Sequence, residues 1–390
     1  MSRKRTCLRS AAFPACLLLL GILMPIKAGA EGQGQLPENL RLSGRYLWAF
    51  GHSFERPFIP TGPFTELNFR LNGRYRINRE WQLEFAYQLD GLYQPNLELF
   101  PPYDDPGSAM KSLLGLDDII EVHTNWAASH KLDRLCLGWR HDEFTLDIGR
   151  QRIAWGTTLA MSFMDMFHPI RPGDPFAPEQ PGTDAIRLQI PTGAVSGWDL
   201  LYAWIDDEGS EAVASKYHET HGDFESALSA GRINGENFTG FQTTGDINDI
   251  GIRVEAAWRD VHNGRKWRLA VESDWAPDEH TYLSGEVFYN GPGATDPMMY
   301  DLNELVRGEL YPARWYAALN CTYNPGGLST LGLFGIGNLT DDSWFFDLSV
   351  QHSLSNTQDI RIGYQHYEGD LISEYGALPD MIYAITSTYF

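Results

Sequence analysis

Alternation between apolar and polar residues is the sequence feature that most constrains the fold of this chain. In residues 67–78, LNFRLNGRYRIN, the large apolar side chains fall on one parity, whereas Arg70, Arg74 and Arg76 fall on the other. Successive side chains of a β-strand point to opposite faces, so this period of two predicts a strand with one apolar and one charged face. The pattern recurs along the chain and helical periodicity is rare. We therefore expect an all-β protein.

The alternating segments, and the lengths of the connections between them, predict how the strands are arranged. Short connections alternate with long ones, as in an antiparallel up-and-down β-barrel with short periplasmic turns and long external loops. We expect 16–18 strands, with 18 favoured. The expected strands are 40–50, 65–78, 81–92, 131–141, 143–151, 184–191, 195–205, 212–219, 224–232, 238–245, 249–259, 266–275, 281–290, 312–323, 328–337, 344–353, 358–367 and 380–390. The expected long connections are 93–130, 152–183, 233–237 with its flanks, 291–311 and 368–379.

The arginine-bearing face must be in contact with water. An arginine that faces lipid at mid-depth costs roughly 2–4 kcal/mol, so three on one strand would cost on the order of 10 kcal/mol, which is comparable to the stability of a whole domain. A soluble β-sandwich with arginines on its outer surface also meets this condition. Strands of about ten residues and aromatic residues at strand ends instead favour a transmembrane barrel.

The first 30 residues are predicted to be a secretory signal peptide that is removed after Ala30. A basic segment at 3–9 precedes an apolar run over 11–26, which is shorter than a membrane anchor requires. Residues 31–390 are then expected to form a single domain. Loss of five basic residues with the signal would change the net charge from −21 to −26, which argues against a nucleic-acid partner.

The signal peptide, the alternating strands and the terminal Phe390 together resemble Gram-negative outer-membrane β-barrels of the porin type. The resemblance implies a location in the outer membrane, contact with its lipid and lipopolysaccharide, and recognition of the last strand, MIYAITSTYF, by the barrel-assembly machinery. One departure is that Thr388, Thr386 and Ala384 are less apolar than the usual pattern before the final Phe.

A second resemblance covers residues 147–193. This segment resembles one found in alginate-export-like and related, uncharacterised, outer-membrane barrels, in which a strand ending in Gly-Arg-Gln leads into Trp-Gly and then an Asn-or-His-Pro turn. The corresponding residues here are Gly149-Arg150-Gln151, Trp155-Gly156 and His168-Pro169.

Arginines on the charged parity are the candidate pore-lining residues. A barrel of this size leaves an aqueous channel unless loops fill it, and a row of arginines would favour passage of carboxylates or phosphates. The alternative is that these arginines pair with Asp and Glu across strands and stiffen the wall. The candidates are Arg41, Arg45, Arg70, Arg74, Arg76, Arg134, Arg140, Arg187, Arg253, Arg268 and Arg361.

The connection 152–183 is the candidate constriction or plug. It is so rich in Met, Phe and Pro that exposure to water would promote association, and folding into the barrel interior would hide it. Contact with a partner chain or with lipopolysaccharide is the alternative. Within the loop 94–130, residues 110–120 are expected to form a short helix. The candidate constriction residues are Trp155, Phe163, Asp165, Phe167 and His168.

These features favour a channel for small or linear, anionic solutes across the outer membrane. A second hypothesis is a plugged barrel that holds an exported polysaccharide or an electron-transfer partner. A third, less favoured, is an outer-membrane hydrolase, because the common catalytic motifs are missing from the sequence. No cofactor is expected, and Cys136 and Cys321 are too few for a cysteine-based metal site.

Overall fold

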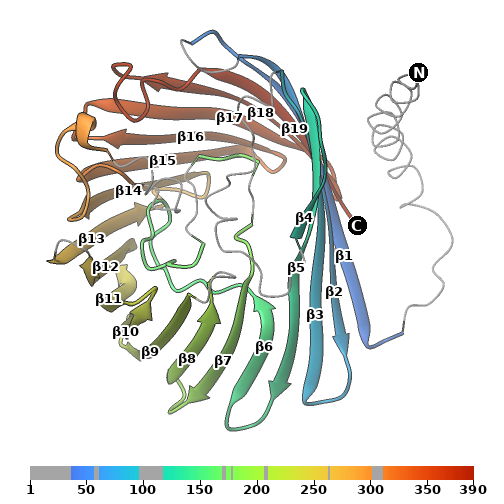
Figure 1. Cartoon of the computed structure of the whole chain (residues 1–390), viewed down its shortest axis with the longest axis vertical. Coiled ribbons are helices and arrows are strands. Elements are labelled where there is room, and N and C mark those ends of the chain that lie inside the picture. The colour runs from blue at the N-terminus through green and yellow to red at the C-terminus, as the bar shows by residue number, and fades with distance from the viewer. Residues whose placement is uncertain are drawn as a thin grey trace, which may run out of the picture.

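The computed structural model describes residues 37–56, 61–95, 117–168, 173–176, 179–205, 210–261, 264–300 and 311–390, and the predicted signal peptide lies outside them. The chain forms a closed antiparallel β-barrel (Figure 1). No helix among these residues is long and apolar enough to cross a membrane. Their strands and 3-10 helix are β1 (Leu40–Ser53), β2 (Gly62–Arg76), β3 (Trp81–Tyr93), β4 (Asp117–Val122), β5 (Trp126–Arg140), β6 (Thr145–Gln151), β7 (Thr183–Pro191), β8 (Ser196–Trp204), β9 (Glu211–His221), β10 (Phe224–Ile233), β11 (Glu236–Ile247), β12 (Ile250–Val261), β13 (Gly264–Trp275), β14 (Thr281–Asn290), η2 (Pro297–Met299), β15 (Trp315–Gly326), β16 (Ser329–Asn338), β17 (Ser343–Ser355), β18 (Gln358–Glu368) and β19 (Met381–Tyr389).

Each wall strand pairs with its neighbours, and the first and last strands close the cylinder. β1 pairs with β2 on one edge and with β19 on the other. β3 pairs directly with β5, so β4 is not a member of the ring, and the remaining 18 strands form it. The predicted up-and-down barrel with 18 strands is therefore confirmed.

β4 corrects the expectation of a short helix at 110–120. Residues 117–120 are extended, and β4 pairs with residues 127–131 of β5; residues 110–116 lie outside the described part. The reason lies in the unequal lengths of two neighbours. β5 has 15 residues, whereas β6 has seven and reaches only as far as Leu135, so the rest of that edge of β5 needs another partner for its backbone groups.

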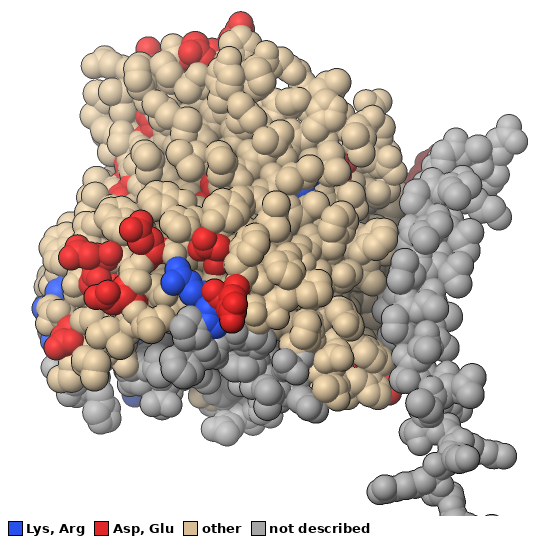
Figure 2. Space-filling view, turned by 90° about the horizontal axis from the view of Figure 1, so that it is seen from above, with Lys and Arg blue, Asp and Glu red and all other residues tan. Residues whose placement is uncertain are grey.

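The outer wall is apolar and uncharged over a broad area. On many wall strands a large side chain points away from the barrel while the following or preceding residue is buried inside, as for Val213 beside Ala214 and Leu269 beside Ala270. Figure 2 shows acidic side chains gathered toward the rims, with few charges on the broad area of wall between them. This arrangement is typical of barrels whose outside faces lipid. Outward side chains that are more than half exposed include Val213, Leu228, Trp267, Leu319 and Leu348.

The connections are short at one end of the barrel and longer at the other, with one correction. Residues 233–237 were expected to lie in a long connection, but β10 and β11 are joined by Asn234 and Gly235 alone. Both residues have positive φ, 50° and 82°, as a two-residue type I′ hairpin requires. The Asn-Gly pair is a strong hairpin signal that the sequence already contained.

Candidate functional site

The chain leaves the wall after Gln151 and returns at Thr183, and between these points it lies inside the barrel (Figure 1). We call the described residues of this connection, 152–168, 173–176 and 179–182, the inner loop. Gln151 fixes its start, because its side-chain amide donates to the carbonyls of Asp147 on its own strand and of Ala185 on β7.

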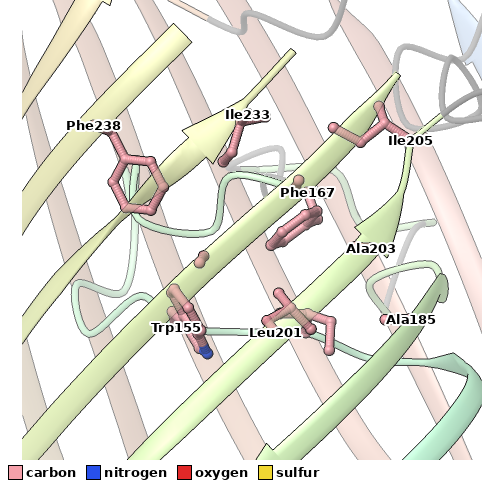
Figure 3. Close-up of a cluster of buried hydrophobic side chains, with 11 residues drawn as sticks. Trp155, Phe167, Ala185, Leu201, Ala203, Ile205, Ile233 and Phe238 are labelled. Atoms are coloured by element: carbon pink, nitrogen blue, oxygen red, sulfur yellow. The ribbon is translucent and has the colours of Figure 1, made fainter. Parts of the chain in front are cut away.

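Trp155 anchors the inner loop to the wall formed by β8, β9 and β11. Its indole Nε1 donates to Asp199 Oδ2 at 3.1 Å, and its carbonyl accepts from Gln242 Nε2. The Lys216 ammonium lies 5.5 Å from the centre of the ring. Trp155 and Phe167 pack with alanines and aliphatic side chains of the wall in a buried cluster (Figure 3). Because this contact excludes water, it favours a large aromatic side chain at position 155.

Gly156 makes possible the tight turn that follows Trp155. Its backbone N–H donates to Asp165 Oδ1 at 2.7 Å. A Cβ atom at Gly156 would lie 1.7 Å from Ser162 Oγ and 3.0 Å from Asp165 Cγ. Residues 156–165 therefore fold back on themselves only with glycine at this position.

Three glutamates on adjacent strands, Glu255, Glu272 and Glu286, bind the backbone of the inner loop. Glu255 accepts from the backbone N–H groups of residues 157, 158 and 164 and from the hydroxyl of residue 162. Glu272 accepts from the N–H of residue 159, and Glu286 accepts from those of residues 160 and 161. All three carboxylates are at most 4% exposed. We call this side of the interior, on β12–β14, the carboxylate wall.

The inner loop also contacts strands near the closing seam of the barrel. The carbonyl of Gly173 accepts from Gln365 Nε2 of β18 at 2.7 Å. The Phe176 ring meets the rings of Phe64 and Tyr383 edge-on, with centroids 5.7 and 5.6 Å apart. The loop is therefore held on well-separated parts of the wall and crosses the barrel interior.

The last segment of the inner loop lies on what we call the guanidinium wall, formed by β1, β2 and β5. Asp133 Oδ2 lies 2.6 Å from Arg70 Nη2 and 2.7 Å from Arg134 Nη1, and its side chain is 2% exposed. A bulge in β5 at this residue brings Asp133 and Arg134 to the same face. Glu179 of the loop adds a second carboxylate, with Oε2 2.9 Å from Arg70 Nε and Oε1 3.9 Å from Arg45 Nη1.

Gln180 ties the loop backbone to the guanidinium wall. Its carbonyl accepts from Arg134 Nη2, and its side-chain oxygen accepts from Arg152 Nε, both at 2.7 Å. Its side-chain nitrogen donates to Asp165 Oδ2 and to the carbonyl of His168. The position of Glu179, one residue earlier, is set by these bonds.

The predicted pore-lining arginines lie on the strand faces opposite the exposed apolar ones, and most have a carboxylate partner. Arg74 pairs with Glu84, Arg140 with Asp147, Arg187 with Asp199, Arg253 with Glu272 and Asp274, and Arg361 with Asp347. Arg268 donates to Asn290. Arg41 and Arg76 are exposed on the same inner parity as Arg74 and Arg45, near the short-turn end. Cross-strand pairing is thus the main arrangement, and the pore-lining role stays a prediction.

The five predicted constriction residues are all buried, between 2% and 8% exposed. Trp155, Phe163 and Phe167 pack against the wall, whereas Asp165 and the carbonyl of His168 accept hydrogen bonds from within the loop. They hold the loop in place, and any narrowing of the lumen comes from the loop backbone and its exposed side chains. Sequence reasoning assigned no role to Asp133, Glu179 and Gln180. A polar cavity of about 180 Å³ lies elsewhere in the interior; its lining includes Asn320, Thr322, Ser349, Gln351 and Arg361.

A separate polar cluster joins the long loops to the barrel end. Glu374 Oε2 accepts from Tyr316 Oη at 2.7 Å and from Asn338 Nδ2 at 2.8 Å. Asn338 Nδ2 also donates to Asp341 Oδ2, at 3.0 Å. Burial raises the pKa of Glu374 to about 8, against its ordinary value of 4.5.

Comparison with solved structures identifies the fold. OccK7 (OpdD) of Pseudomonas aeruginosa is 12% identical over 90% of this chain and 99% of its own, with a TM-score of 0.56. The BenF-like porin of Pseudomonas fluorescens is 11% identical over 90% and 99%, with a TM-score of 0.56. OccAB1 of Acinetobacter baumannii is 9% identical over 93% and 99%, with a TM-score of 0.54. No protein-family model and no curated protein matches the chain. The chain has the fold of porin-type outer-membrane β-barrels.

Proposed function

We propose that this porin-type barrel is an outer-membrane channel for small or linear, anionic solutes. The observation that carries the proposal is the inner loop, which is bound to the carboxylate wall by backbone amides and reaches the guanidinium wall on the other side of the bore. A loop held in this way narrows the lumen without depending on its own secondary structure. Solutes would pass beside it along charged, hydrated side chains.

Preference for anions rests on the guanidinium wall. Arg45, Arg70 and Arg134 lie together near the middle of the barrel, and Arg41 and Arg74 face each other across β1 and β2 closer to the short turns. Charges in a narrow, partly desolvated space act more strongly than in bulk water. The carboxylates of the opposite wall are occupied by the loop, so they contribute less to the field that a solute meets.

The burial of the inner loop favours a second candidate, a plugged barrel that serves as a scaffold. Trp155 and Met161 are almost completely enclosed, and the packing between loop and wall resembles a protein core. Such a barrel would conduct little and would act through its external loops.

Planar-bilayer recordings of the full chain separate the two candidates. The channel proposal expects steady, ohmic conductance and a reversal potential that indicates anion preference. Protein that stays silent, and conducts only after deletion of the inner loop, would support the plugged scaffold instead.

A variant with Arg41→Gln and Arg74→Gln tests the anion preference. Loss of two exposed guanidinium groups from the inner face is expected to shift the reversal potential toward cations. The matched control is Arg232→Gln, since Arg232 lies on the outer parity of β10 beside its two-residue turn and should leave selectivity unchanged. Equal selectivity in all three proteins would contradict the preference.

We also propose lipid and lipopolysaccharide as the surroundings of the barrel, and the barrel-assembly machinery as the partner of its last strand. Phe390 exchanges two backbone hydrogen bonds with Gly44 of β1, and its ring stacks on that of Phe69 at 6.2 Å. Phe390 thus has a defined place in the closing seam once assembly is complete.

A further inference from the structure

The two carboxylates on the guanidinium wall differ in how firmly they are held. Asp133 contacts Arg70 and Arg134, accepts from the backbone N–H of Gly182 at 3.1 Å, and is almost fully buried. Glu179 contacts the same Arg70, but its side chain is 42% exposed. Asp133 is therefore a permanent counter-ion, whereas Glu179 is in contact with the solvent of the lumen.

Arg45 is incompletely paired in this arrangement. Its Nη2 donates to Asn68 Oδ1 at 3.0 Å, and its Nη1 lies 3.9 Å from Glu179, which is the longest contact of the cluster. Its Nε is buried and has no hydrogen-bond partner among the described residues. A guanidinium group can bind a carboxylate through two parallel hydrogen bonds, so Arg45 has donor capacity that Glu179 does not use.

We propose that Arg45 and Arg70 form a carboxylate-binding site whose resting occupant is Glu179, and that the carboxylate of a passing solute exchanges with it. The inference rests on the proposed channel function and adds a ligand class and a form of self-inhibition. Glu179 is presented by a backbone that Gln180 fixes, so the side chain can leave the arginines without movement of the loop. Because the Glu179 side chain is 42% exposed, solvent in the lumen screens its ion pairs with the less exposed Arg45 and Arg70, which favours such an exchange.

Without Glu179, Asp133 would still contact Arg70 and Arg134, and Arg45 would lose the one carboxylate that it contacts in this cluster. The carboxylate of an incoming solute would supply the missing negative charge. A solute with one carboxylate and a short apolar tail matches the group that it replaces, because the glutamate side chain is itself a tethered propionate. Occupancy by the solute and occupancy by Glu179 are mutually exclusive.

The test compares the wild-type protein with Glu179→Gln in single-channel recordings, with propionate as the probe and neutral propionamide as its control. Glu179→Gln should lower the propionate concentration that half-maximally changes the chloride current by about tenfold, the factor that corresponds to one charge-assisted hydrogen bond. Propionamide should act equally on both proteins. Glu179→Asp has a shorter side chain that reaches Arg45 less well. Its half-maximal propionate concentration should therefore lie between those of the wild type and Glu179→Gln.

Glu84→Gln is the matched control variant, because Glu84 is a partly exposed carboxylate of the same inner face that pairs with Arg74. It removes the same charge and should leave the propionate response at its wild-type value. An equal shift in Glu84→Gln and Glu179→Gln would mean that net charge alone is responsible, and would overturn the proposal.

Fluorine NMR of trifluoropropionate added to detergent-solubilised protein gives a readout that needs no ion flow. Line broadening should appear at about tenfold lower ligand concentration with Glu179→Gln than with the wild type. Identical titrations of the two folded proteins refute the exchange even if the channel conducts anions. Absence of conductance combined with the expected NMR difference would refute the channel and leave the binding site standing.

Discussion

The two charged walls of the barrel interior use the same kinds of side chain for different purposes. On the carboxylate wall, Glu255, Glu272 and Glu286 are dry, and their partners include backbone N–H groups of the inner loop. On the guanidinium wall, Gln180 and Gly182 also make backbone hydrogen bonds, but Glu179 binds only through its side chain and remains in contact with the lumen. Backbone amides cannot be exchanged for a solute, whereas a single side chain can. The carboxylate wall is therefore an anchor, and the guanidinium wall is where a ligand can compete.

The strongest way to break this contrast is to remove the anchor. We expect the variant with Glu255→Gln, Glu272→Gln and Glu286→Gln to release residues 157–164, because each hydrogen bond to a charged group is worth roughly 1.5–3 kcal/mol and a glutamine presents donors as well as acceptors to the loop amides. Single-channel conductance should rise severalfold, and the loop should become susceptible to limited proteolysis.

Glu84→Gln, which changes a carboxylate of β3 that pairs with Arg74, should alter neither readout. Unchanged conductance together with protease resistance in the triple variant would show that packing of Trp155 and its neighbours, rather than the carboxylates, holds the loop.

A smaller effect is expected from a substitution at Gly156, in the turn that directs the inner loop toward the carboxylate wall. Gly156→Ala places a Cβ atom 1.7 Å from Ser162 Oγ, so Ser162 must move away from Glu255. Overpacking of this kind costs about 1–3 kcal/mol. Thermal unfolding in detergent should detect the loss, and Gly326→Ala is the control, because a Cβ there meets nothing within 4 Å. Equal stability of the two variants would contradict the tight turn.

The smallest effect is expected outside both walls, at Glu374, whose carboxylate accepts hydrogen bonds from Tyr316 and Asn338. Burial raises its pKa to about 8, so the docked loop keeps a proton that the undocked loop loses near pH 4.5. Docking of residues 369–380 should therefore weaken as the pH rises from about 4.5 to about 8 and then level off. Hydrogen exchange of this loop measures the change, and Glu374→Gln should abolish it.

The strands and the orientation of their faces could be predicted from the sequence because both depend on local alternation and on a large energetic penalty. The parity of Arg70 and Arg74 could not be reversed without placing several charges in lipid. Even β10, which has few large apolar residues, was placed to within one residue, although the turn that follows it was expected to be long. The inner loop was singled out by its apolar composition alone.

The features that could not be predicted from the sequence depend on elements that come into contact only after folding. β4 forms because β5 extends beyond the end of β6, and no local sequence pattern predicts that difference in length. Asp133 reaches the interior because a bulge shifts the parity of β5 by one residue. Glu179 lies 109 residues after Arg70 in the chain, so their contact follows from the path of the loop and could not be read from spacing.

The contact between Gly44 and Phe390 makes closure of the barrel depend on a close fit between its first and last strands. A Cβ atom at Gly44 would lie 2.2 Å from the tip of the Phe390 ring, so glycine at this position of β1 leaves the space that the ring occupies. A truncated chain without β19 would have two unpaired strand edges. The backbone groups of those edges could not form hydrogen bonds in lipid. Such a fragment would remain a substrate for proteolysis, because its unpaired edges keep the backbone accessible.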